Sequence, residues 1–175
     1  MTTATGRGVV LLAAVGLLLL GAGGSTARDG RSPDLDDYDV LRPPAGSRVA
    51  FEAYAEGVQV YQWTGTTWTF VGPEAVLYDL DGDVVGIHYA GPTWETVSGS
   101  TVVGAVVSRA TPDPTAIPWL LLRAVSADGP GVLRRATHVQ RLYTTGGLVP
   151  AAPGGVPGEM ARVPYTAYYF FYRTQ

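Results

Sequence analysis

Short runs of β-branched and aromatic residues alternate along most of the chain with Gly, Pro and Asp, which favour turns. Several runs also alternate apolar and polar positions. Strand-length runs bounded by turn residues are typical of a β-sandwich or a β-barrel. The pattern predicts strands at residues 49–55, 58–63, 67–71, 75–80, 84–89, 101–110, 117–127, 136–143 and 163–172.

Two of the predicted turns carry strong hairpin signals. Gly65, between Trp63 and Trp68, permits a positive φ, and Asp81-Gly82 stands between two apolar runs. The apolar segment 117–127 fits either a buried strand or a helical turn, and turn residues close on both sides of it favour a strand. The fold class predicted is therefore all-β, a single antiparallel β-sandwich or β-barrel-like domain.

The first residues of the chain follow a different pattern. Arg7 precedes a nearly unbroken apolar run at residues 9–20, and the small residues 25–27 follow it. This is the pattern of a secretory signal peptide, predicted at residues 1–27 with cleavage after Ala27. The alternative is an uncleaved anchor, but the run is shorter than the roughly 20 apolar residues that cross a bilayer. We therefore expect a secreted, extracellular protein with no stable membrane anchor after cleavage.

The rest of the chain divides into two parts. Residues 28–47 are acidic and contain Pro43-Pro44, which predicts an extended or disordered arm, and residues 48–175 form the all-β domain. The chain has no cysteine, so its stability must come from packing, to which four Trp and ten Tyr contribute. A formal net charge of −3 without a basic patch argues against nucleic acid as a partner.

Six segments, in order, resemble a secreted domain-of-unknown-function family, number 3455, found in bacteria and filamentous fungi. They are residues 57–61, 72–75, 88–95, 116–122, 140–142 with 146–147, and 163–167. The resemblance implies neither an established activity nor catalytic residues, and the family's common cysteines are absent here. Some fungal relatives carry the label malate dehydrogenase. This chain has no strand-Gly-x-Gly-x-x-Gly-helix unit for a dinucleotide, and we expect no cofactor.

His88, Trp94 and Glu95 are the most prominent candidate site residues. A turn at Gly91-Pro92 would bring the end of one strand near the start of the next. A histidine and a carboxylate that meet could share a proton, and an aromatic ring beside them could stack on a flat ligand. The alternative is a histidine hydrogen-bonded within the sheet and a tryptophan in the core. A zinc site made of His88, His138 and a carboxylate lacks diagnostic spacing.

Two other motifs suggest chemistry only weakly. Asp79, Asp81 and Asp83 alternate as calcium ligands can, but the EF-hand glycine and terminal carboxylate are missing, so a charged hairpin tip is the preferred interpretation. No Gly-x-Ser-x-Gly elbow is present.

Two functions therefore stay open. The first is a non-catalytic ligand-binding or surface-associated module whose partner is a small molecule or a glycan, with Tyr61, Trp63, His88, Trp94 and Glu95 as its site. The second is a small secreted hydrolase or metal-assisted enzyme. It would use His88 and Glu95 as acid and base and Arg141 to hold an anion.

Overall fold

The computed structural model describes Met1, residues 32–35 and residues 37–174, and the predicted signal peptide lies almost entirely outside these residues. Nearly all of the regular structure is β-strand. The strands are β1 (Ser47–Trp63), β2 (Trp68–Tyr78), β3 (Val84–Tyr89), β4 (Thr93–Thr96), β5 (Thr101–Ala110), β6 (Trp119–Asp128), β7 (His138–Gly146) and β8 (Met160–Thr174). Two short 3-10 helices, η1 (Asp39–Leu41) and η2 (Val132–Arg135), complete the structure.

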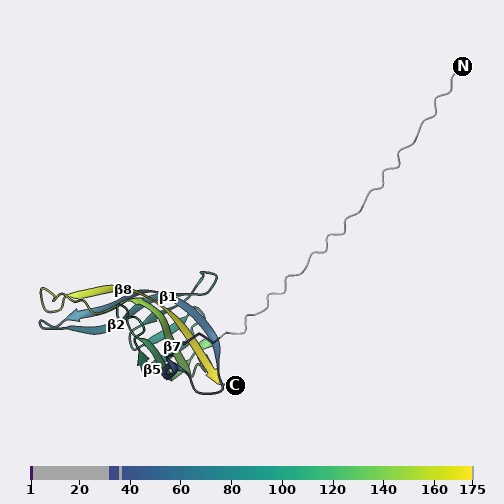
Figure 1. Ribbon diagram of the computed structural model, residues 1–175, viewed down its shortest axis with the longest axis horizontal. Coiled ribbons are helices and arrows are strands. Elements are labelled where there is room, and N and C mark those ends of the chain that lie inside the picture. Colours follow the sequence, from purple (N-terminus) through teal and green to yellow (C-terminus); the bar gives the residue numbers. More distant parts are fainter. Residues whose placement is uncertain (2–31, 36, 175) are drawn as a thin grey trace.

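The strands form one closed antiparallel barrel. Each strand pairs with the next along the chain, and β1 pairs with β8 to close the sheet. Figure 1 shows β1 and β8 side by side along the length of the molecule. The all-β prediction is confirmed, and of the two architectures that the sequence left open the structure has the barrel.

Strand β1 is longer than the sequence suggests, because Gly57 lies inside it rather than in a turn. Gly57 pairs with Ala75 of β2 and with Tyr165 of β8. A Cβ atom at this position would come within 2.2 Å of the Glu74 carbonyl oxygen. Glycine here permits a close approach of two strands, so the predicted strands 49–55 and 58–63 are one strand.

Strand β2 likewise runs through Gly72 and Pro73, which were expected to separate residues 67–71 from 75–80. Pro73 pairs with Gln59 of β1, whereas pairing of β2 with β3 begins only at Ala75. At Pro73 the strand is paired on one side only, with β1, and such a position tolerates proline. The four-residue strand β4 was not predicted, because a segment that short shows no alternation.

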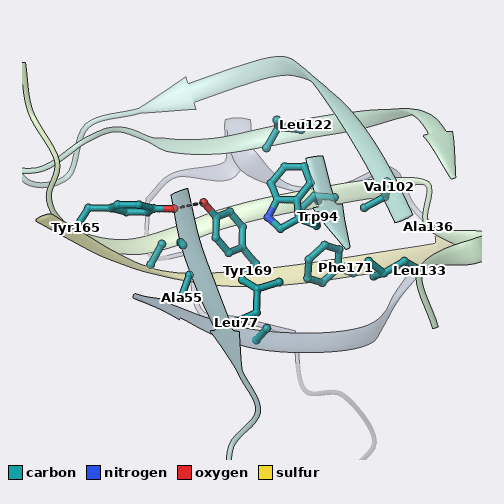
Figure 2. Packing of buried hydrophobic residues seen from close by; sticks show 14 of the residues in the cluster. Ala55, Leu77, Trp94, Val102, Leu122, Leu133, Ala136, Tyr165, Tyr169 and Phe171 are labelled. Atoms are coloured by element: carbon teal, nitrogen blue, oxygen red, sulfur yellow. Dashed lines mark hydrogen bonds between the residues drawn. The ribbon is translucent and has the colours of Figure 1, made fainter. Parts of the chain in front are cut away.

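Alternate residues of β8 supply several of the large side chains inside the barrel. Tyr165, Tyr169 and Phe171 point inward, and Figure 2 shows the last two beside Trp94 in the core. Leu133 of η2 is fully buried in the same cluster, and its backbone N–H donates to Ser100 Oγ at 3.3 Å. The aromatic rings of the last strand therefore close the core.

The predicted arm is ordered in the part that the structure describes. Leu35 and Leu41 are buried against Trp119 and Phe170 on the outer face of the barrel. Gln140 Nε2 donates to the Leu41 carbonyl oxygen at 2.6 Å. The expectation of an extended or disordered arm is therefore wrong for residues 37–46, because the outer face of β8 is aromatic and needs a cover. Within residues 32–35 and 37–174, no helix is long and apolar enough to cross a membrane.

Candidate functional site

A cavity of about 450 Å³ lies inside one end of the barrel. The β1–β2, β3–β4 and β5–β6 connections are at this end, whereas η2 lies at the other. The inner wall of the cavity includes Gln59, His88, Trp94, Arg141 and Tyr169. The rim of the cavity includes the exposed residues Phe70, Val106 and Arg109. The remaining lining residues are Tyr61, Val71, Gly72, Pro73, Gly91, Pro92, Ile117, Pro118, Leu120 and Leu122.

His88 and Trp94 are directly opposite each other on β3 and β4, and both face the interior. Their rings stack with centroids 4.4 Å apart and planes 5° apart. His88 Nδ1 is 2.8 Å from the Thr93 carbonyl oxygen, so Nδ1 carries the proton and donates it. Burial lowers the pKa of His88 to about 3; the hydrogen bond to Thr93 opposes this shift, and the charge of Arg141 adds to it. The imidazole is therefore neutral at physiological pH.

Arg141 brings the positive charge to the inner wall of the cavity. It lies on β7, and its Nε and Nη2 donate to the Pro118 carbonyl oxygen at 3.1 and 2.9 Å. These two bonds hold the guanidinium group in place. Within the described part of the chain no carboxylate forms a salt bridge with it, since the two ion pairs found are Arg42–Asp39 and Arg162–Glu74. The arginine is thus half-buried, fixed in orientation and unpaired with an acid.

Two buried hydrogen-bond donors of the cavity wall have no partner among the described residues. They are Trp94 Nε1 and Gln59 Nε2, on side chains whose residues are 1% and 2% exposed. More than nine in ten buried polar groups in proteins are hydrogen-bonded, so two such atoms on one cavity are unusual. An indole N–H can only donate. Both atoms are closed to solvent, so an acceptor in the cavity would satisfy them after a small movement of the wall.

Two tyrosines, Tyr61 and Tyr169, line the cavity, and Tyr165 lies next to Tyr169. Tyr61 donates to the Gly147 carbonyl oxygen at 2.7 Å, which ties β1 to the β7–β8 connection. The hydroxyls of Tyr165 and Tyr169 are 3.5 Å apart (Figure 2). Burial raises the pKa of Tyr61 and of Tyr169, and the Arg141 charge opposes both shifts. The phenols therefore stay protonated while the arginine makes the surrounding potential positive.

The structure brings together four of the six residues predicted for the site: Tyr61, His88, Trp94 and Arg141 all line the cavity. Glu95 does not. It follows Trp94 on β4 and so points to the opposite face of the sheet, where its Oε2 accepts a hydrogen bond from the Tyr89 hydroxyl at 3.0 Å. The proposed acid–base pair of His88 and Glu95 is therefore separated by the sheet itself.

Trp63 also lies outside the cavity. Its ring is 5.4 Å from that of Trp68, and the backbone of Gly154 lies against it. Trp68 Nε1 donates to the Ala152 carbonyl oxygen at 2.9 Å. The tryptophan pair thus fixes the β1–β2 hairpin to the long β7–β8 connection.

Sequence reasoning missed Gln59, Arg109 and Tyr169 as cavity residues. Gln59 could have been found, because it lies two residues before Tyr61 in β1 and so points to the same face. A polar residue on an inward face suggests a functional role. Arg109 and Tyr169 gave no such signal, since their place depends on strand pairing around the whole barrel.

The aspartate motif forms a hairpin tip. Asp79 Oδ1 accepts hydrogen bonds from the backbone N–H groups of Asp81 and Asp83 at 3.0 and 2.9 Å. This is an Asx-type turn that needs no ion. Among the described residues, no group of three or more His, Cys, Asp or Glu side chains is placed to hold a metal.

Fold and cavity together define the class: a closed, eight-stranded antiparallel β-barrel with an interior cavity at one end. The chain belongs to the DUF3455 family, described as proteins of unknown function, whose sequence model matches residues 44–173. This match spans nearly the whole barrel and confirms the resemblance seen in the sequence. No curated protein and no solved structure matches the chain significantly.

Proposed function

We propose that the protein is an exported, non-catalytic β-domain that binds a small molecule in the barrel cavity. The observation that carries the proposal is the pair of buried, unpartnered donors on the cavity wall, Trp94 Nε1 and Gln59 Nε2. Leaving a buried donor unsatisfied costs roughly 1–3 kcal/mol. A ligand with acceptor atoms would recover this free energy.

The size and the lining of the cavity support the same function. A volume of about 450 Å³ falls within the roughly 300–1,000 Å³ typical of small-molecule sites. Its walls are mainly apolar, with Phe70, Ile117 and Leu122 among the contributors. A few polar groups on an apolar wall provide affinity through burial and orientation through hydrogen bonds.

The chemistry of the lining favours binding over hydrolysis. Among the described residues, those that line the cavity include no Asp, Glu, Ser or Cys. His88 is stacked on Trp94, and its pKa of about 3 lies far from the range in which a general base works best. Glu95 is on the other side of the sheet, so the enzyme alternative lacks its acid–base pair.

Export rests on the sequence. The apolar run at residues 9–20 and the small residues at 25–27 give the pattern of a cleaved signal peptide. A barrel that is stable without disulfides could work outside the cell, where its cavity would meet extracellular small molecules or glycans.

The test blocks the cavity rim with one side chain. Val106 and Val107 are adjacent on β5 and both exposed, but only Val106 lines the cavity. We expect Val106→Trp to abolish the thermal shift that a ligand gives, with Val107→Trp behaving like the unaltered protein. The measurement is a melting screen of residues 28–175 with apolar acids, amides, alcohols and soluble glycans. A ligand at about 100 times its Kd adds about 2.7 kcal/mol of stability.

Both variants add the same indole to the same strand, so a difference in ligand shift between them is due to the position of Val106 in the cavity. A ligand shift that persists unchanged in Val106→Trp would place binding elsewhere and contradict the proposal.

A further inference from the structure

We infer that the ligand is an amphipathic monocarboxylate, an organic acid with one carboxylate head and an apolar body. This inference rests on the proposed function and names the chemical class that the cavity would take. It follows from the charge, the donors and the walls of the cavity.

The charge of the cavity is positive. Arg141 is on its inner wall and Arg109 on its rim, and no acidic side chain is among the lining residues that the structure describes. The titratable groups on the wall report the same field, because Arg141 is the one charged residue that acts on the pKa of Tyr61, His88 and Tyr169. A half-buried charge without a counter-charge is costly, and an anionic ligand would offset that cost.

The unpartnered hydrogen-bonding groups of the cavity are donors, so a ligand has to supply acceptors. Trp94 Nε1 and Gln59 Nε2 are donors without partners. The guanidinium group of Arg141 has five N–H donors. Its Nε and Nη2 donate to Pro118, a further hydrogen bond links it to the Tyr169 side chain, and the remaining N–H groups are left for a ligand. A carboxylate is acceptor-only, and it matches an arginine fork in geometry.

The walls give the ligand an apolar body and hold one cation, Arg141, inside the cavity, whereas Arg109 is exposed on the rim. Ile117, Leu120 and Leu122 line the interior, and Phe70 and Val106 line the rim. These side chains offer nothing to a second ionised group, and stripping water from a dianion such as a phosphate would cost far more than from a monoanion. One carboxylate can meet Arg141 while its chain or ring lies against the apolar wall.

The experiment uses three ligands with the same apolar body: octanoate, octanamide and octylamine. We expect octanoate to bind residues 28–175 about tenfold or more tightly than octanamide, since charge-assisted hydrogen bonds are about twice as strong as neutral ones. Octylamine should bind most weakly, because its head is a donor and a cation. Isothermal titration at neutral pH and low salt measures all three.

Two arginine variants test the role of the charge. Arg141→Gln should reduce octanoate binding about tenfold and leave octanamide binding nearly unchanged. Arg123→Gln removes the same charge from an exposed position on β6 outside the cavity and should change neither. If Arg141→Gln does not fold, the ligand series on the unaltered protein decides by itself.

The outcomes separate the inference from the proposed function. Octanamide or octylamine could bind as tightly as octanoate and lose that binding in Val106→Trp. This result would overturn the carboxylate inference and keep the cavity as the binding site. Octanoate binding that is untouched by Val106→Trp would overturn both. If none of the three compounds binds measurably, the carboxylate inference is overturned. The wider melting screen then decides whether the cavity binds a small molecule of another class.

Discussion

Acidification from pH 6.5 to pH 3 should destabilise the protein steeply, and a His88→Gln variant should lose most of that steepness. The folded state lowers the pKa of His88 from 6.5 to about 3, mainly through burial. Between these values the unfolded chain binds a proton that the folded protein does not. The free energy of unfolding is therefore highest, as far as His88 is concerned, above pH 6.5. It falls by about 1.4 kcal/mol per pH unit as the pH drops toward 3.

Urea unfolding at intervals from pH 7 to pH 3.5 measures this dependence. Carboxylates also titrate in the range, but they do so equally in the unaltered protein and the variant, so the difference isolates His88. His138→Gln is the matched control, since His138 is the other histidine of the chain and lies only partly buried at the start of β7. Parallel curves for the unaltered protein and His88→Gln would show that His88 is not buried as a neutral ring.

The second large effect is at Gly57. Gly57→Ala should destabilise the barrel by about 3 kcal/mol or more, because its Cβ would lie 2.2 Å from the Glu74 carbonyl oxygen and 2.5 Å from the Ala75 Cβ. The obstacle is backbone on a paired strand, which cannot move aside as a flexible side chain can. Chemical unfolding at neutral pH gives the difference.

Gly155→Ala is the control for this substitution. Gly155 lies in the β7–β8 connection, and the nearest atom to an added Cβ would be Glu159 Oε2 at 3.4 Å, an ordinary contact. Its unfolding free energy should change by no more than about 0.5 kcal/mol. Equal losses at the two positions would mean that β1 and β2 are not paired as closely at Gly57 as the structure has them.

The sequence predicted the strands better than their ends. Alternation and the Asp81-Gly82 turn located β3, and Pro118 with residues 129–131 correctly marked 117–127 as a strand. Gly57 was misleading, because a glycine that ends a strand and a glycine that lets two strands approach look identical in sequence. The arm was misjudged for a related reason: its charge indicated disorder, whereas Leu35 and Leu41 cover rings that only the folded β8 presents.

The site was predictable where it depended on local strand geometry. His88 and Trp94 flank one short turn, so their meeting could be anticipated from the chain. Glu95 could have been excluded by the same geometry, since neighbours on a strand point to opposite faces. Arg141 and Gln59 come to the cavity from β7 and β1, and their convergence is set by closure of the barrel, which no short-range pattern encodes.

The most direct test of binding in the cavity is the indole N–H spectrum of the four tryptophans, Trp63, Trp68, Trp94 and Trp119. In a ¹⁵N–¹H correlation experiment, octanoate or the strongest ligand of the melting screen is titrated into residues 28–175. We expect the Trp94 indole proton to move downfield as it gains an acceptor, and the Trp68 proton, already bonded to Ala152, to stay in place. A saturable ligand that shifts Trp63 or Trp68 and leaves Trp94 unmoved would contradict binding in the barrel cavity.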